Sequence, residues 1–436
     1  MVLNFLLLAI VIISYLYFFR FSVYPLTLSY PLFMIFIGLL IFENSTCVKI
    51  YFFFSLELLV IGYYWGIKSM IKKSKTIGTF KNRLLTYSKH PSVDYYSFSV
   101  LSVVYITFLV YHFAKVGIPI LGNTEVDRFN FAGSGLFGLP GRIYLYGIPF
   151  LFILTFVYNA VVVNKHKHFK YLFFLVFSTF LISRFLSGFK SGVLEVLALI
   201  ILTYVVVYGP VNMFLLIVRN FLLIIVSILY AFWVFAKYLS ITNTYSSVIR
   251  YLLERSFYIS AQPSIFVFSH NLFKGYFNYF LNDILYFAGK YFYLFKPYNF
   301  PTNKIISSLI YHVPLEESSF VVPVTLTAIS EFYLNFGFTV SMFLILFTGY
   351  IFGWLYSKSC LENKHLQIGI LIIFQEALIE FINKGNLIYI VFNYLFVLIL
   401  TLLSYRFLNL MLRSLISTIS QGKKVQNSKF SANNHF

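Results

Sequence analysis

Long apolar runs follow one another along most of this chain and constrain its fold more than any other feature. A helix needs about 20 mainly apolar residues to cross the hydrocarbon core of a bilayer, and runs of this length recur from the first residues onward. The sequence therefore predicts an all-α, polytopic integral membrane protein. We expect about eleven spans, within a range of ten to thirteen, near 2–19, 22–42, 48–67, 93–114, 143–163, 170–187, 192–208, 213–236, 338–356, 366–382 and 387–408.

The composition agrees with this prediction. Of the 436 residues, 60% are hydrophobic and only 11% are charged, whereas roughly a quarter of a soluble domain is charged. The net charge of +19 would suggest nucleic acid in a soluble protein. In a membrane protein most of this excess flanks the spans on the cytoplasmic side, and we expect no nucleic-acid partner. Cys47 and Cys360 lie in separate apolar segments and indicate neither a disulfide framework nor a zinc site.

The basic segments predict the orientation. Segment 68–90, "KSMIKKSKTIGTFKNRLLTYSKH", has seven Lys and Arg and no acid, so we expect it in the cytoplasm. Counting spans from there also places 164–170, 357–365 and the C-terminal tail inside, and each of these is basic. The N-terminus then lies outside. The first apolar run has no basic leader and no small-residue cleavage site, so we interpret it as a retained span.

Four regions follow from this span pattern. They are a membrane domain with the first eight spans (1–236), a long extracytoplasmic loop with amphipathic or re-entrant helices (237–337), the last three spans (338–412), and a disordered basic tail (413–436). In the long loop, the aromatic run 276–295 is interrupted by Asn282, Asp283 and Lys290. An interfacial or re-entrant helix fits this run better than a span does.

Several cations lie where the orientation rule does not require them. The stretch "SRFLSGFKSGVLEV" (183–196) places Arg184, Lys190 and Glu195 at the junction of two spans. The second helix is expected to begin near Ser191, so its N-terminal amides face the same place and favour an anion. A bound phosphate explains these uncompensated cations. A local pair of Glu195 with Arg184 or Lys190 is the alternative.

A second group of cations lies in "SSVIRYLLERSFY" (246–258), which has a helical pattern. Arg250 and Glu254 are four residues apart and can pair on one face. Arg255 points elsewhere on such a helix. Because a guanidinium holds phosphate through a planar fork, Arg250 and Arg255 are candidates for binding a diphosphate.

Glu331 lies in an otherwise apolar stretch, "SSFVVPVTLTAISEFYLNFG" (318–337). The pattern predicts a helix that begins at Pro323 and ends at Gly337, with Glu331 and Asn335 one turn apart on the same face. Ionisable residues in apolar segments usually face a bundle interior or a cavity. Glu331 is therefore either a general base or a structural partner that orients one of the arginines.

Two further groups have a functional and an ordinary interpretation. Glu376, Glu380 and Lys384 recur every four residues, a stripe that is typical of a salt-bridge seam between helices. His312, in "IYHVPLEE", has acids nearby and is a candidate base, although a lone histidine in a loop is usually incidental.

Five motifs resemble, in order, those of the Wzy-type O-antigen and capsule repeat-unit polymerases. Three are an outer loop with an arginine and glycines, a turn between spans, and an arginine-bearing helix. A Glu-x-Tyr-x-Asn-Phe-Gly segment and a basic residue before glycine between the last two spans complete the set. Here they read "VDRFNFAGSGLFGLPGR", "SGFKSG", "RYLLER", "EFYLNFG" and "KGN". This chain has Lys190 and Lys384 at positions where an arginine would fit the pattern equally well. A lysine cannot bind phosphate in the bidentate manner of a guanidinium, so bidentate binding is not expected at those positions.

The resemblance implies a metal-independent glycosyltransferase in the bacterial cytoplasmic membrane, with no cofactor. Such an enzyme transfers a growing oligosaccharide from undecaprenyl diphosphate onto a newly flipped lipid-linked repeat unit, so its partners are this lipid-linked oligosaccharide, membrane lipid, a flippase and a chain-length regulator. Glu331, Arg255 and His312 would be catalytic. The residues that would bind substrate are Arg128, Arg142, Arg184, Lys190, Arg250, Tyr333, Asn335 and Lys384.

Two other functions fit the same pattern. An O-antigen ligase, or another enzyme that uses polyprenyl-linked sugars, would share the spans and the arginines. A lipid-oligosaccharide flippase belongs to a different class and moves its substrate without chemistry. Against a flippase, we find no inverted repeat of the kind common in transporters.

Overall fold

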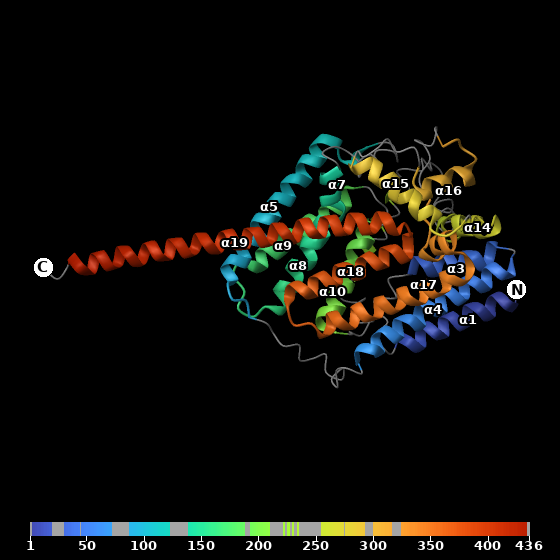
Figure 1. The fold of residues 1–436 in the computed structure, drawn as a ribbon, viewed down its shortest axis with the longest axis horizontal. Helices are drawn as coiled ribbons and strands as arrows, with labels where there is room; N and C mark the ends of the chain where they lie inside the picture. Colours follow the sequence, from blue (N-terminus) through green and yellow to red (C-terminus); the bar gives the residue numbers. More distant parts are fainter. Residues whose placement is uncertain are drawn as a thin grey trace.

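The computed structural model is all-helical throughout the part of the chain it describes. It describes residues 2–19, 30–43, 45–71, 87–122, 138–187, 192–209, 254–273, 275–292, 300–315 and 324–433, with short pieces between 221 and 234. Figure 1 shows the helices gathered into one bundle with the N-terminal helix at one end. The principal α-helices are α1 (Val2–Phe19), α3 (Tyr30–Phe42), α4 (Thr46–Ile71), α5 (Pro91–Val116), α7 (Leu139–Arg142), α8 (Ile148–Val161), α9 (Phe169–Leu186), α10 (Gly192–Tyr208), α14 (Ser260–Ser269), α15 (Asn278–Phe292), α16 (Thr302–Tyr311), α17 (Ala328–Leu361), α18 (His365–Lys384) and α19 (Leu387–Asn433).

The lengths and compositions of these helices confirm a polytopic membrane protein. Seven helical segments in the described residues are long and apolar enough to cross a bilayer. Three shorter apolar helices, Val2–Ser14, Pro31–Phe42 and Gly192–Tyr208, accompany them. They coincide with ten of the expected spans, and most of the remaining one, 213–236, lies outside the described residues.

Helices α4 and α17 pack against each other at backbone contact. A Cβ atom added to Gly353 of α17 would lie 1.9 Å from the carbonyl oxygen of Tyr63, and one added to Gly66 of α4 would lie 2.1 Å from that of Tyr350. Gly62 and Gly349 make equivalent contacts. Small residues spaced four apart allow membrane helices this close approach, so the four glycines join an early helix to a late one.

Helix α17 contains a break at the position where the sequence predicted an end. Gly337 has φ 68° and ψ −171°, so the helix continues past it only across a kink. The expected start at Pro323 is wrong: the helix begins at Ala328, and Thr327 caps it by accepting a hydrogen bond from the amide of Ser330. Cap geometry, rather than the preceding proline, therefore decides where this helix starts.

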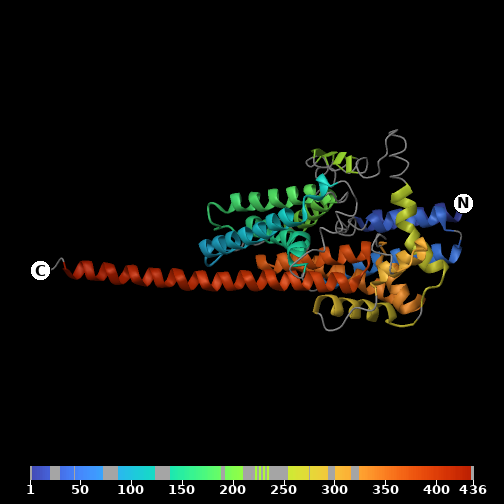
Figure 2. The same cartoon turned by 90° about the horizontal axis from the view of Figure 1, so that it is seen from above.

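Helix α19 is the longest element in the described part of the chain. Both views show it running through the bundle and continuing beyond it to the C-terminus (Figures 1 and 2). The structure continues the helix through Asn433, where the sequence predicted a disordered tail from 413. The region contains no proline, and proline is the residue that would most strongly stop a helix.

Asp94 joins several helices at the end of the bundle where α5 begins. Its buried carboxylate accepts hydrogen bonds from Ser88 (2.5 Å), Tyr158 (3.3 Å), Tyr405 (2.9 Å) and Asn409 (2.9 Å). A buried carboxylate is costly unless it is well hydrogen-bonded, and these donors supply that stabilisation. Asp94 thus ties α5 to α8 and α19.

The aromatic run expected to form an interfacial helix is α15, and Asp283 on it caps the start of α16. Asp283 Oδ1 accepts hydrogen bonds from the amide of Thr302 at 2.7 Å and from its hydroxyl at 3.0 Å. Asn282 donates to the carbonyl of Phe300 at 2.7 Å. Two of the three polar residues that interrupt the apolar pattern therefore hold α15 and α16 together.

We predict that the contribution of Asp283 to stability falls as the pH rises. Burial raises the pKa of Asp283 from 3.8 to about 6, against the opposing effect of the Thr302 hydrogen bonds. The folded protein thus holds this proton more tightly than the unfolded chain does. Its stabilising contribution is complete below pH 3.8 and is lost as the pH rises through about 6. The loss amounts to at most about 3 kcal/mol.

Hydrogen exchange of α16 amides, measured from about pH 5 to about pH 8, tests this prediction. After correction for intrinsic exchange rates, wild-type α16 should lose protection as the pH rises. Asp283→Asn keeps the accepting oxygen but cannot titrate, so its protection should vary less. Identical pH dependence in both proteins would contradict the prediction.

Candidate functional site

Glu331 caps the start of the last helix. Its side chain is buried, and its two oxygens accept hydrogen bonds from the backbone amides of Asn386 and, at 2.8 Å, Leu387. The first amides of a helix have no partner within that helix, and a carboxylate there is favoured by the helix dipole. Glu331 is thus a structural partner of backbone amides, where the sequence suggested either a general base or a partner for an arginine.

The turn between α18 and α19 is shaped to receive this carboxylate. Gly385 and Asn386 both have left-handed backbones, with φ 61° and 59°. A Cβ atom at Gly385 would lie 2.7 Å from Glu331 Oε2 and 3.0 Å from the carbonyl oxygen of Leu326, so the position requires glycine on both counts. The structure therefore brings together the "EFYLNFG" and "KGN" motifs, which are more than fifty residues apart.

Asn335 performs a similar task for another helix. Its side-chain oxygen accepts from the amide of Phe280 at 2.7 Å, in the first turn of α15, and its amide group donates to the carbonyl of Glu331 at 3.0 Å. Tyr333 donates to Asn271 at 2.8 Å. Asn335 is buried. Both residues were expected to bind substrate, and they join α17 to α15 and to the segment that follows α14.

Arg184, Glu195 and Lys384 meet near the start of α10. One oxygen of Glu195 lies 3.5 Å from Arg184 and the other lies 3.7 Å from Lys384. Lys384 also lies 3.2 Å from Glu380, one turn earlier on α18. The alternative interpretations, a local Arg184–Glu195 pair and a salt-bridge seam, are therefore confirmed. The expectation of an uncompensated cation is wrong for Arg184, and Lys190 lies outside the described residues.

Arg184 is held rigidly within this group, which we call the ion cluster (Arg184, Glu195, Glu376, Glu380 and Lys384). The guanidinium donates to the carbonyl of Leu145 at 2.7 Å and lies over the ring of Tyr144 with 5.0 Å to its centre. The side chain is only 7% exposed, whereas Lys384 is 51% exposed. One cation of the ion cluster is thus fixed in the protein interior and the other reaches the surface.

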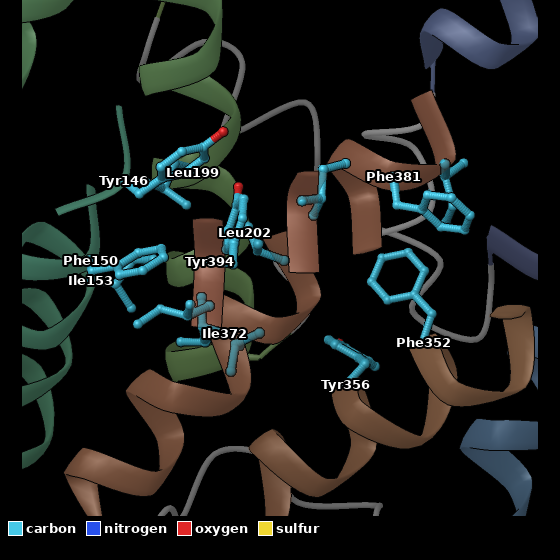
Figure 3. Packing of buried hydrophobic residues seen from close by; sticks show 14 of the residues in the cluster. Tyr146, Phe150, Ile153, Leu199, Leu202, Phe352, Tyr356, Ile372, Phe381 and Tyr394 are labelled. Carbon is cyan, nitrogen blue, oxygen red and sulfur yellow. The ribbon is translucent and has the colours of Figure 1, made fainter. Parts of the chain in front are cut away.

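The carboxylates of α18 complete the ion cluster. Glu380 accepts a hydrogen bond from Tyr394 at 2.7 Å. Glu376, one turn away, is close enough to Arg184 and Glu380 for their charges to interact. The ring of Tyr394 packs against that of Tyr146, with 4.7 Å between the ring centres (Figure 3). The ion cluster therefore rests on the apolar core of the bundle.

The other predicted site residues share no described contact with Glu331 or lie outside the described part. Arg142 is buried with its guanidinium over the rings of Phe392 and Phe396, 5.4 Å and 5.1 Å from their centres. His312 is exposed immediately after α16 and has a left-handed backbone, φ 54°. Arg255 begins a π-helical turn, and its side chain is not described. Arg128, Lys190 and Arg250 lie outside the described residues.

Two features were not predicted from the sequence. One is the buried carboxylate of Asp94 with its four hydrogen-bond donors, and the other is the hydroxyl of Tyr394, which donates to Glu380. A usable signal existed for Asp94, since it is an acid directly after a basic segment at the start of a span. Nothing in the sequence links it to Tyr405 or Asn409, more than 300 residues later.

Comparison with known proteins leaves the family open. No protein-family model matches the chain, and neither a curated protein nor a solved structure matches it.

Proposed function

We propose that this chain is an oligosaccharide repeat-unit polymerase that uses polyprenyl-diphosphate-linked substrates. The observation that carries the proposal is the meeting of two separate motifs and Glu195 at one end of the bundle. "EFYLNFG" contacts "KGN" through Glu331, and the lysine of "KGN" contacts Glu195, three residues after the end of "SGFKSG". Motifs brought together by folding, rather than by sequence, support a common site.

The proposal includes a topology. We place eleven spans in a bacterial cytoplasmic membrane, with the N-terminus and the Glu331 end outside and the C-terminus inside. The basic segments support this orientation, because Lys89 and Lys165 lie near the opposite, Asp94 end, where positive charge is retained in the cytoplasm. The long segment 237–337 then lies outside.

The chemistry requires an anion site and a proton acceptor. The acceptor sugar's hydroxyl attacks the anomeric carbon of the donor, the bond from that carbon to the diphosphate oxygen breaks, and the diphosphate leaves with the electron pair. Arg184 and Lys384 stabilise its charge, together with Arg128, Lys190, Arg250 and Arg255. We assign Glu331 to positioning, because both its oxygens cap α19. His312, which is exposed, is the proposed base.

Lys384→Gln tests the proposal in cells that make the glycan. Lys384 is half exposed, so this variant should insert normally. We expect long-chain glycan to fall at least tenfold, because one cation at the leaving group is lost, and single-repeat glycan to accumulate. Lys364→Gln, at the exposed N-cap of α18 at the Asp94 end, is the matched control and should make normal chains.

The glycan pattern in a deletion strain separates the candidate functions. A polymerase deletion leaves exported single repeats. A ligase deletion leaves long polymer on its lipid carrier, and a flippase deletion leaves no exported repeat. Either of the last two patterns, or normal chain length in Lys384→Gln, would contradict the proposal.

A further inference from the structure

We infer that Glu195 occupies, as an internal substitute, a binding site for a phosphate or diphosphate group between Arg184 and Lys384. The inference rests on the proposed function, which supplies a diphosphate substrate, and adds that the protein closes this site with its own carboxylate. Binding of the substrate then requires Glu195 to move aside.

The position of Glu195 is that of an anion bound between two cations. Each of its oxygens faces a different cation, Arg184 at 3.5 Å and Lys384 at 3.7 Å. Both distances are long for ion pairs with direct hydrogen bonds, which are about 2.7–2.9 Å. The side chain is 37% exposed. An accessible carboxylate between two cations can be exchanged for another anion.

Each of the two cations also has contacts that do not involve Glu195. Arg184 is held by the carbonyl of Leu145 and by the rings of Tyr144 and Phe180. Its Nε is buried and has no hydrogen-bond partner in the described structure, which leaves a donor for a ligand. Lys384 keeps its contact with Glu380. Removing Glu195 therefore leaves the two cations near their present positions.

The backbone at the start of α10 also favours an anion at the position of Glu195. Gly192, the first residue of α10, packs so closely that a Cβ atom there would lie 2.8 Å from the carbonyl oxygen of Arg184. The N-terminal end of α10 is thus held beside the backbone of Arg184. Glu195 lies in the first turn of α10, where the helix dipole stabilises negative charge. A phosphate in the place of Glu195 would gain the same stabilisation.

The charges of the ion cluster also allow Glu195 to be exchanged for a phosphate. With Glu195 turned away, Arg184 and Lys384 balance the charges of Glu376 and Glu380, which lie in the same cluster. The ion cluster then has no surplus carboxylate to repel an incoming anion. Glu195 thus supplies one negative charge that a phosphate can replace.

Glu195→Gln tests the inference on purified full-length protein. Inorganic pyrophosphate binding is measured by calorimetry in detergent, and polyprenyl diphosphate binding is measured in nanodiscs of neutral lipid. We expect Glu195→Gln to bind pyrophosphate about tenfold more tightly than the wild type, because the competing charge is gone. Adding Lys384→Gln to Glu195→Gln should remove the gain.

Two variants serve as matched controls. Glu380→Gln removes a charge from the same cluster but leaves Glu195 between the cations, so its gain should be much smaller. Glu362→Gln, at the exposed end of α17, should leave affinity unchanged. Melting temperatures of all variants verify that each is folded.

The outcomes separate the possible ligands and the two proposals. A gain with both ligands supports a general phosphate site, and a gain with the lipid alone supports a site for the lipid headgroup. Absence of any gain in folded Glu195→Gln, or an equal gain in Glu380→Gln, overturns the inference. Because binding is measured without turnover, a normal glycan pattern in Lys384→Gln would overturn the proposed function alone.

Discussion

Gly353→Leu should abolish the folded protein. The Cβ of any residue there would lie 1.9 Å from the carbonyl oxygen of Tyr63, so α4 and α17 would have to separate along their contact. Overpacking usually costs about 1–3 kcal/mol. The cost here should reach or exceed the upper end of that range, because the obstructing atom is backbone and cannot adopt another rotamer. We expect no monodisperse protein on size-exclusion chromatography in detergent.

A graded series makes this prediction specific. Gly353→Ala already introduces the Cβ clash and should lower the melting temperature clearly, while Gly353→Leu should be worse. Phe343→Leu is the matched control, because Phe343 lies on the same helix with 67% exposure and its replacement adds no clash. A Gly353→Leu protein that elutes and melts like the wild type would show that the two helices do not pack at this distance.

The pairing of α4 with α17 illustrates the limit of prediction from the sequence. Both glycine pairs are visible there, as "GYYWG" (62–66) and "GYIFG" (349–353), and each is a known pattern for close helix packing. The pattern does not say which helix is the partner. That information depends on how nearly 300 intervening residues fold, so the spans were predictable and their neighbours were not.

Local features were predicted better than contacts between distant segments. The break at Gly337 follows from the conformational freedom of glycine, and the shared face of Glu331 and Asn335 follows from helical spacing. Their partners, Asn386 and Phe280, lie on other helices. The sequence supplied the polar residues of the candidate site, but an apolar setting alone does not distinguish a base from a cap.

The pairing of Arg184 shows why electrostatic reasoning from the sequence needs alternatives. Arg184 was correctly expected near the start of α10, yet Glu195 lies within the first turn of the same helix and reaches Arg184. Burying an unpaired guanidinium is costly, so a nearby acid is more economical than an absent ligand. The same acid then becomes the competitor that a phosphate must displace.

Glu331→Ala should be the most damaging polar substitution at this end of the bundle. It leaves the amides of Asn386 and Leu387 without their acceptors, at a cost of about 2–4 kcal/mol for two buried donors. The turn that carries Lys384 should loosen with them. We expect a large fall in melting temperature and faster hydrogen exchange across 384–390.

Comparison of three variants separates this capping role from catalysis. Glu331→Gln keeps one accepting oxygen and should lose only part of the stability. Glu362 also accepts hydrogen bonds from two backbone amides, at 3.0 Å and 3.1 Å, but at the exposed end of α17, so Glu362→Ala should have a small effect. If Glu331→Ala and Glu331→Gln both melted like the wild type while glycan synthesis failed equally, Glu331 would act chemically. A fall in stability that follows the number of lost acceptors instead identifies the residue that holds Lys384 in place.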